Sequence, residues 1–283
     1  MDKKIAIVTG ADGGMGTAIT QTVAKAGFHV VMACRNLEKA SVVKSQIEKE
    51  TGTEIDLVQV DLASVASILR CVEEIKNRYD HISLLLNNAG TLCHKPETTI
   101  DNLERTVGVN YFGHYVWSHA LLPLMGDGTR VVNMVSLTYK YGRIRDNIFT
   151  PRTKKNFNRF STYSDSKLAF LYFTLDAAEA WKEKGIVVNC ADPGIVSTNI
   201  IRMGNKVVDT LCDIFFRPII RKPLQGAATL LHLALSEETK DITGQCFASK
   251  KRIKISDKIL NNPRRQWLHE KTEEVLAEIK RSL

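Results

Sequence analysis

The chain has 283 residues and a formal net charge of +8; hydrophobic residues make up 44% of it and charged residues 25%. These values fit one large globular domain or two small ones, and they exclude wholesale disorder, collagen-like repeats and disulfide-bonded mini-scaffolds. No run approaches the roughly 20 apolar residues of a membrane span, and we expect no cleavable signal. Six scattered cysteines without a Cys-x-x-Cys pair indicate reduced thiols in a cytoplasmic protein, with no metal site and no disulfide framework.

The basic charge is concentrated in two segments. Residues 140–160 hold seven basic side chains against Asp146, and residues 250–283 hold ten basic against five acidic side chains. Such segments are typical of a solvated face, of the rim of an anionic-ligand site, or of a surface for nucleic acid or membrane. Because no aromatic stacking row or base-reading motif accompanies them, we expect no nucleic-acid partner.

Short β-branched runs alternate along the chain with longer helical patterns. The expected strands are 5–9, 29–34, 55–60, 83–87, 130–135, 186–190 and 245–248. The expected helices are 15–26, 37–50, 64–78, 99–125, 162–184, 224–236 and 266–282. Most of these strands are continuous apolar runs, as in parallel strands that are covered on both faces. The pattern predicts an α/β fold: a single doubly wound Rossmann-type domain over 1–250, with a mainly parallel seven-stranded sheet and helices on both faces, and a basic helical extension over 251–283.

A glycine-rich turn directly follows the first expected strand. Residues 9–16 read Thr-Gly-Ala-Asp-Gly-Gly-Met-Gly and lead into a helix. Glycines let backbone N–H groups approach a pyrophosphate, and a helix N-terminus carries partial positive charge. We therefore expect a dinucleotide phosphate site here, the alternative being a tight turn that binds nothing. Asp12, inside this loop, would repel a phosphate unless it points away or is paired.

The end of the second expected strand discriminates between two cofactors. An NAD site would place a carboxylate there for the ribose hydroxyls, but none occurs before Glu38. Arg35 stands at this point instead, and a guanidinium group suits a 2′-phosphate. We predict NADP(H), with an ordinary surface arginine as the alternative. Asp61, after the third strand, is expected either to bind the adenine amino group or to cap the next helix.

Further polar motifs follow the later strands, where doubly wound proteins bind their ligands. They are Asn-Asn-Ala-Gly at 87–90, Ser136, Tyr-Ser-Asp-Ser-Lys at 163–167 and Asp-Pro-Gly at 192–194. Tyr163 and Lys167 lie one turn apart on the same face of a predicted helix. A nearby ammonium group favours a phenolate, and a bound oxidised nicotinamide would add a second positive charge. We expect the two together to lower the pKa of Tyr163 by about 2–3, into the range of general acid–base catalysis.

The order of these motifs over residues 3–248 resembles the short-chain dehydrogenase/reductase family. Three features resemble its retinol-dehydrogenase-like branch: the long interval between Ser136 and Tyr163, Ala-Cys-Arg at the end of the second strand, and Tyr-x-x-Ser-Lys-Leu. The resemblance implies that Tyr163 exchanges a proton with the substrate oxygen and that Ser136 orients this oxygen. It implies that Lys167 tunes Tyr163 and binds the nicotinamide ribose, and that Asn110 holds a proton-relay water.

The resemblance also implies a cofactor site and a homodimer. The cofactor-binding residues would be Gly10, Asp12, Gly13, Gly14, Met15, Gly16, Arg35, Asn36, Asp61, Leu62, Asn88, Ala89, Gly90, Tyr163, Lys167, Pro193, Gly194, Val196 and Thr198. The homodimer would pack through the 99–125 and 162–184 helices.

Two more segments are candidates for the border of a substrate cleft. The basic insertion near 141–160 is expected to be a solvated loop or a flap at the mouth of the cleft. The apolar stretch 203–220 is expected to be core or dimer packing, a lid over an apolar substrate, or a helix that rests on a membrane.

Together these motifs predict an NADP(H)-dependent oxidoreductase. It would transfer a hydride between the nicotinamide and a small apolar alcohol or carbonyl compound, such as a steroid, a retinoid or a similar lipid. The alternative is a non-catalytic NADP(H)-binding regulatory protein on the same fold. Such a regulator would not need the complete set of Asn110, Ser136, Tyr163 and Lys167.

Overall fold

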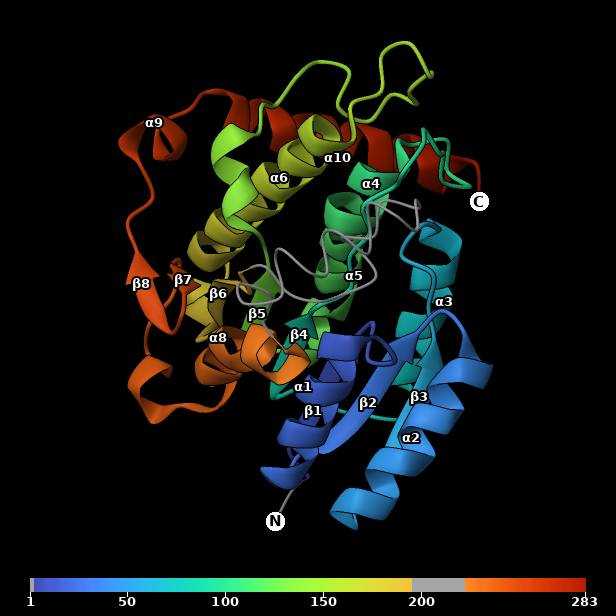
Figure 1. Ribbon diagram of the computed structural model, residues 1–283, viewed down its shortest axis with the longest axis vertical. Helices are drawn as coiled ribbons and strands as arrows, with labels where there is room; N and C mark the ends of the chain where they lie inside the picture. The colour runs from blue at the N-terminus through green and yellow to red at the C-terminus, as the bar shows by residue number, and fades with distance from the viewer. Residues whose placement is uncertain (1–2, 195–221) are drawn as a thin grey trace, which may run out of the picture.

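The structure, a computed structural model, describes residues 3–194 and 222–283, and a single sheet runs through them (Figure 1). The strands are β1 (Ile5–Thr9), β2 (His29–Cys34), β3 (Ile55–Gln59), β4 (Leu84–Asn87), β5 (Arg130–Met134), β6 (Val187–Asp192), β7 (Cys246–Ala248) and β8 (Lys251–Ile253). Their order is β3-β2-β1-β4-β5-β6-β7-β8, and only the β7–β8 pair is antiparallel. The strand order reverses beside β1, which creates a ligand-binding crevice at the carboxyl ends of β1 and β4.

Helices cover both faces of this sheet, as predicted. The α-helices are α1 (Gly14–Lys25), α2 (Leu37–Thr51), α3 (Val65–Lys76), α4 (Arg105–Val107), α5 (His114–Leu121), α6 (Arg159–Ala180), α8 (Pro223–Leu235), α9 (Asp257–Leu260) and α10 (Arg264–Arg281). A π-helix, η1 (Gly108–Gly113), and four 3₁₀ turns complete the set: η2 (Leu122–Leu124), η3 (Leu137–Tyr141), η4 (Lys182–Lys184) and η5 (Glu237–Thr239). Side chains of α1, α2 and α8 form the core on one face, and those of α3, α5, α6 and α10 form it on the other.

The sheet has one strand more than the predicted seven. β8 lies in the segment that was expected to be wholly helical, and it pairs with β7 through a turn in which Ser249 and Lys250 have positive φ values of 49° and 62°. Its three residues, Lys-Arg-Ile, are too few and too polar to predict a strand. The backbone hydrogen bonds to β7 make this segment a strand, and a local pattern cannot reveal such a partner.

The helix expected over 99–125 begins later and is not uniform. Residues before Arg105 form a turn in which Thr98 bridges to Glu104, and the Glu104 side chain then accepts the N–H of Val107 to start the helix. The π-helix η1 follows directly. A π-helix holds one extra residue per turn and is rare in regular helices, so it changes the direction in which its side chains point. Asn110 lies in this element.

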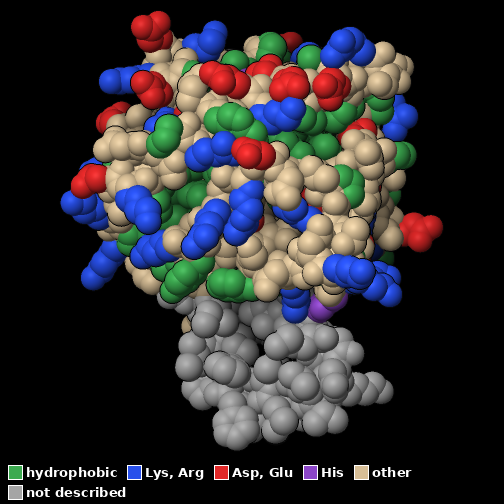
Figure 2. Space-filling model, turned by 90° about the horizontal axis from the view of Figure 1, so that it is seen from above, with side chains coloured by type: hydrophobic (Ala, Val, Ile, Leu, Met, Phe, Trp, Pro, Cys, Tyr) green, Lys and Arg blue, Asp and Glu red, His purple; other side chains and the backbone are tan. Residues whose placement is uncertain are grey.

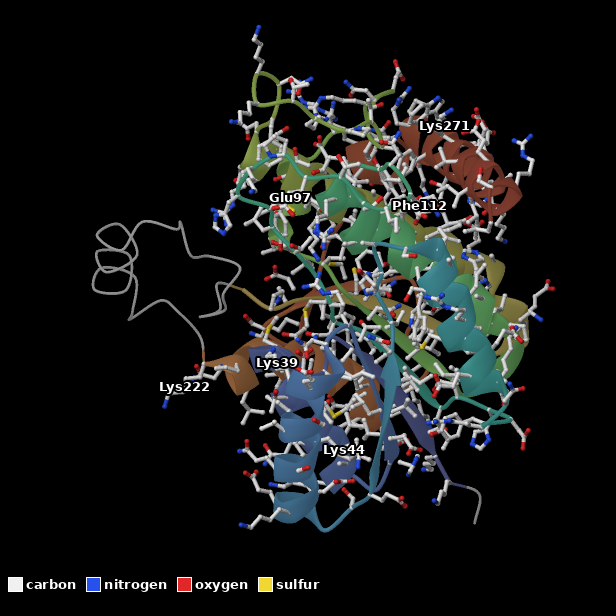
Figure 3. The ribbon with its side chains drawn as sticks, turned by 90° about the vertical axis from the view of Figure 1, so that its right-hand side faces the viewer. Lys39, Lys44, Glu97, Phe112, Lys222 and Lys271 are labelled. Carbon is white, nitrogen blue, oxygen red and sulfur yellow. The ribbon has the colours of Figure 1, made fainter. Side chains whose placement is uncertain are left out.

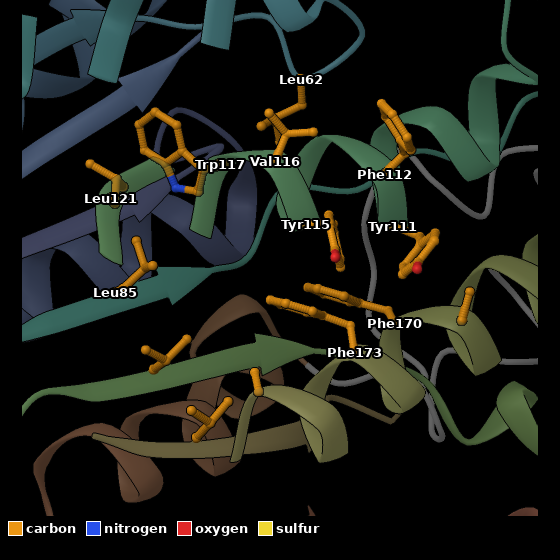
Figure 4. Packing of buried hydrophobic residues seen from close by; sticks show 14 of the residues in the cluster. Leu62, Leu85, Tyr111, Phe112, Tyr115, Val116, Trp117, Leu121, Phe170 and Phe173 are labelled. Carbon is orange, nitrogen blue, oxygen red and sulfur yellow. The ribbon is translucent and has the colours of Figure 1, made fainter. Parts of the chain in front are cut away.

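Helix α10 packs across α5 and α6 on the outer side of the domain. The hydroxyls of Tyr111 and Thr272 share a hydrogen bond at 2.7 Å, and Arg265 forms an ion pair with Asp176. Figure 4 shows the rings of Tyr111 and Tyr115 facing the aromatic side chains of α6. Every residue over 164–178 except Asp176 is buried. Because α6 has no free face along this stretch, a homodimer of this chain would have to use another surface.

The basic insertion near 141–160 is anchored at its start. Arg145 forms an ion pair with Asp165 of α6, and Arg264 of α10 pairs with Asp146 at 2.6 Å. Three apolar side chains of the segment are buried in the core: Ile144, Ile148 and Phe149. Figure 2, which looks down on this side of the molecule, shows Lys and Arg side chains spread over the face with acidic ones among them. The start of the segment is therefore built into the domain, whereas none of residues 150–160 is buried, as in a solvated loop.

Candidate active site

The turn between β1 and α1 has room only for glycine at two positions. Gly10 has a φ of +62°, and a Cβ on it would lie 3.0 Å from the Cα of Ala89. A Cβ on Gly16 would lie 2.0 Å from the carbonyl oxygen of Gly10. No side chain caps the N-terminus of α1, where Gly13 is the N-cap residue. The first-turn N–H groups of α1 are therefore available to an anion at the crevice.

A pocket of about 560 Å³ lies beside this turn. Most of the expected cofactor residues line it: Gly10, Asp12, Gly13, Gly14, Met15, Gly16, Arg35, Asn36, Asp61, Leu62, Asn88, Ala89 and Gly90. Sequence reasoning missed six lining residues: Ala33, Lys39, Val60, Thr91, Arg105 and Val109. Of these, Lys39 could have been found, because it is a second basic side chain one turn beyond Arg35.

Lys39 explains how an acidic residue fits the phosphate loop. Its Nζ lies 2.7 Å from the Asp12 carboxylate and also donates to the carbonyl oxygen of Asp12 at 2.7 Å. Figure 3 shows Lys39 on the first turn of α2, at the end of that helix nearest the centre of the molecule. Asp12 is thus paired, which is one of the two conditions under which the loop could accept a phosphate. Arg35, on the same side of the pocket, is exposed.

Asn36 and Asp61 line the pocket and also order the backbone. The Asn36 side chain accepts the N–H of Lys39 at 2.9 Å and caps α2. Asp61 accepts the N–H of Ala63 at 2.9 Å, while the N-cap of α3 is Ser64. Asp61 therefore stabilises the turn that leads to α3 and also lines the pocket.

The catalytic candidates of α6 lie at the carboxyl ends of β5 and β6. Lys167 is buried, its Nζ donates to the carbonyl oxygen of Met134 at 2.8 Å, and it lies 5.6 Å from the centre of the Tyr163 ring. Burial lowers the pKa of Lys167 to about 8. Its ammonium group therefore lies over the ring of Tyr163 and bonds to the backbone at the end of β5.

Burial governs the protonation of Tyr163 in the protein without cofactor. Burial raises the pKa of Tyr163 to about 12, a hydrogen bond with Ser136 opposes this shift, and the charge of Asp192 adds to it. In the protein without cofactor, burial outweighs the other influences on Tyr163. Tyr163 is therefore a neutral phenol at neutral pH, hydrogen-bonded to Ser136. The lowering of its pKa by Lys167 together with a bound oxidised nicotinamide stays a prediction.

Asn110 is held firmly from two sides. Its Oδ1 accepts the N–H of Thr91 at 2.7 Å, and its Nδ2 donates to the carbonyl oxygen of Thr91 at 2.8 Å and to the hydroxyl of Ser166 at 3.1 Å. A Cβ on Gly90 would lie 3.4 Å from Asn110 Oδ1 and 3.8 Å from Lys167 Nζ. Asn110 and Lys167 thus meet at Gly90, a lining residue of the pocket. The water expected on Asn110 stays a prediction.

Of the remaining expected residues, the structure describes Pro193 and Gly194. Gly194 follows β6, and its N–H donates to Asp192 at 2.9 Å; neither Pro193 nor Gly194 lines the pocket. Val196 and Thr198 lie outside the described residues, and so does the expected lid over 203–220.

The described residues fit a nicotinamide dinucleotide. The turn has no room for a Cβ at Gly10 and Gly16, and helix α1 begins without a side-chain cap. Both features suit the pyrophosphate of the dinucleotide. The pocket extends from the exposed Arg35 to Gly90, so a bound dinucleotide would end beside Lys167. Among residues 3–194 and 222–283, no helix is long and apolar enough to cross a membrane. The same residues contain no group of three or more His, Cys, Asp or Glu side chains that could hold a metal ion.

Comparison with known proteins identifies relatives of this chain. A sequence model of the short chain dehydrogenase family matches residues 4–207. Retinol dehydrogenase 11 of Mus musculus is 32% identical over 248 residues, which cover 87% of this chain and 77% of that protein. Retinol dehydrogenase 14 of Mus musculus is 31% identical over 289 residues, covering 94% and 84%.

Solved structures show the same architecture. A short chain dehydrogenase from Burkholderia cenocepacia in complex with NADP has a TM-score of 0.68 and 25% identity, and the match covers 87% of this chain and 95% of that one. A dehydrogenase/reductase from Sinorhizobium meliloti has a TM-score of 0.70 and 24% identity, with 88% and 94% covered. The family model matches residues 4–207, and both retinol dehydrogenases are more than 30% identical to this chain over most of its length. This chain therefore belongs to the short-chain dehydrogenase/reductase family and is retinol-dehydrogenase-like.

Proposed function

We propose that the protein is an NADP(H)-dependent oxidoreductase that acts on an apolar secondary alcohol or carbonyl compound. The observation that carries the proposal is the grouping of Ser136, Tyr163 and Lys167, with Lys167 beside Gly90, a lining residue of the glycine-cradled pocket. A steroid, a retinoid or a similar lipid is the proposed substrate class. The bound nicotinamide would supply or accept the hydride.

The side chains of this chain would orient the substrate and handle its proton. The hydroxyls of Ser136 and Tyr163 share a hydrogen bond, so a substrate oxygen placed between them would be held by both. A neutral Tyr163 phenol suits the step that gives a proton to the oxygen of a carbonyl substrate. Lys167, with its ammonium beside Gly90, would bind the ribose hydroxyls, and Asn110 would hold the water that restores the proton.

The preference for NADP(H) over NAD(H) is proposed from two basic side chains. Arg35 lies at the end of β2 and Lys39 on the first turn of α2, and both line the same pocket. A guanidinium group can bind a 2′-phosphate in a bidentate manner. Lys39 already neutralises Asp12, so Arg35 is the cation that would carry most of the discrimination.

An apolar substrate is proposed from two exposed rings that are close in sequence to Ser136 and Tyr163. Tyr141, at the end of the turn that follows Ser136, is 70% exposed, and Phe160, one turn before Tyr163 on α6, is 56% exposed. Their ring centres are 5.9 Å apart. Large apolar surfaces of this kind at the border of a site typically bind hydrocarbon, and the curated relatives are dehydrogenases of retinol.

One alternative function and two properties of the whole protein are open to test. A non-catalytic NADP(H)-binding regulator would share the pocket but would show no turnover. The five cysteines of the described residues are free and buried, which fits the cytoplasmic location that we propose. A homodimer stays a prediction, to be tested by sedimentation.

Oxidation of NADPH in the presence of a panel of ketones and aldehydes tests the function directly. The panel would run from small polyol-related carbonyls to steroid and retinoid carbonyls, with NADH in a parallel series. We expect turnover to rise with the apolar surface of the substrate. Tight binding of NADPH with no turnover across the panel would favour the regulator, and a preference for sugars would contradict the apolar cleft.

A further inference from the structure

A buried carboxylate at the end of β6 lies beside the catalytic groups. Asp192 is 5% exposed, and its two oxygens accept two backbone N–H groups, from Leu137 at 2.8 Å and from Gly194 at 2.9 Å. Leu137 directly follows Ser136, and Gly194 belongs to the turn after β6. One carboxylate therefore ties the backbone beside Ser136 to the neighbouring strand end.

The charge of Asp192 acts on both catalytic groups of α6. It raises the pKa of Lys167 against the lowering by burial, and it adds to the raised pKa of Tyr163. The Nζ of Lys167 donates to the carbonyl oxygen of Met134 at the end of β5, and the strand partner of Met134 is Ala191, the residue before Asp192. Asp192 therefore lies at the strand end next to Lys167, where its charge favours the ammonium form of this buried lysine.

The other titratable groups packed around this site are neutral near pH 7. Burial lowers the pKa of His114, on α5, to about 3, and raises that of the Cys190 thiol on β6. Burial also raises the pKa of Tyr139, on η3. None of them can take over the charge of Asp192 at neutral pH.

We propose that Asp192 is a positioning residue of the reaction, which fixes the backbone beside Ser136 and keeps Lys167 in its ammonium form. This inference rests on the proposed function, in which the Lys167 ammonium binds the cofactor ribose and Tyr163 gives a proton to the substrate.

The first test follows the proton on Lys167 in the protein without cofactor. NMR of ¹⁵N-lysine-labelled protein, with the Lys167 signal assigned from Lys167→Arg, would be titrated in the wild type and in Asp192→Asn. The amide keeps the shape of the side chain and removes its charge. We expect the midpoint of Lys167 deprotonation to fall by about one pH unit or more in Asp192→Asn.

Asp176→Asn is the matched control. Asp176 is a half-buried carboxylate of α6 that pairs with Arg265, away from Lys167, so its loss should destabilise the fold without moving the Lys167 midpoint. If Asp192→Asn does not fold, Asp192→Ser supplies an uncharged acceptor at the same place. An unchanged midpoint in a folded variant overturns the inference. Loss of the fold in both variants overturns it as well, because a positioning role requires a folded chain.

The second test follows function. NADPH affinity of the wild type should decrease on the alkaline side as Lys167 loses its proton, and this decrease should start at lower pH in Asp192→Asn. Carbonyl reduction needs both a protonated Tyr163 and a charged Lys167, so its alkaline limit should move in the same direction. A wild type that does not bind NADPH would refute the proposed function, while the NMR result would still decide the role of Asp192.

Discussion

The two ends of the site handle charge in opposite ways. At the nucleotide end, Arg35 and Lys39 are exposed, and Asp12 is paired with Lys39 at the surface. At the catalytic end, Lys167 and Asp192 are both buried, and the charge of Asp192 acts on Lys167. Exposed charges are screened by water and salt, whereas buried ones act strongly on their neighbours. We therefore expect substitutions to have small, salt-dependent effects at the first end and large effects at the second.

Tyr163→Phe should give the largest effect. The hydroxyl is proposed to act in proton transfer only, so turnover should fall by roughly 10²–10⁴-fold while NADPH affinity stays close to that of the wild type. Steady-state kinetics and fluorescence titration measure the two quantities. Tyr79→Phe is the control, because Tyr79 bonds to Asp56 far from the site and its loss should not change turnover. Wild-type turnover in Tyr163→Phe would contradict the catalytic assignment.

Arg35→Ala should have the next largest effect, at the exposed end. Loss of a charge-assisted contact to a 2′-phosphate should weaken NADPH binding by roughly 10–150-fold and leave NADH binding nearly unchanged. Arg78→Ala, which removes an exposed arginine paired with Glu74, should alter neither affinity. Equal binding of NADPH and NADH by the wild type would show that Arg35 does not select the cofactor.

His114 gives a test of buried titration that does not depend on any ligand. Burial lowers the pKa of His114 from 6.5 to about 3, so the folded chain keeps it neutral while the unfolded chain takes up a proton below about pH 6.5. This contribution to the free energy of unfolding is present above that pH and is lost as the pH falls, by about 1.4 kcal/mol per pH unit. Denaturant unfolding at pH 7 and pH 5 measures it. In His114→Gln this part of the pH dependence should be absent, and an equal loss in both proteins would contradict it.

Lys39→Ala should have the smallest effect of the four. It leaves the charge of Asp12 unpaired beside the phosphate loop, so NADPH affinity should fall by a few-fold at low salt and by less at high salt. The double variant with Asp12→Asn should recover most of the loss. Lys44→Ala, on the same helix and paired with Glu48, is the control and should bind NADPH normally. A loss that does not change with salt would indicate a direct contact of Lys39 with the cofactor.

The distinction between local patterns and distant partners explains which parts of the fold could be predicted from the sequence. The parallel strands and the glycine turn were predictable because each depends on a local pattern, a continuous apolar run or a residue without a Cβ. Most of the predicted nucleotide-end residues line one pocket for that reason. The missed strand β8 and the late start of the 99–125 helix depend on partners elsewhere in the chain, namely β7 and the turn before Arg105.

The protonation of the catalytic end could not be predicted for a related reason. The spacing of Tyr163 and Lys167 places them on one face, but it does not tell how deeply that face is buried. Burial raises the pKa of Tyr163 and lowers that of Lys167, so the depth of α6 in the domain decides both. The role of Lys39 was hidden in a similar way, because its partner Asp12 is distant in sequence.

The packing of α10 over α5 and α6 has a consequence for folding during synthesis. During synthesis, α5 and α6 leave the ribosome well before α10, since β6, β7 and β8 come between. Until α10 arrives, the outer sides of Tyr111 and Tyr115 have no partner and face water. Exposed aromatic surface of this kind is where nascent chains aggregate or bind chaperones. The docking of α10 therefore completes the packing around α6, and it also ends the period in which the nascent chain is prone to aggregate.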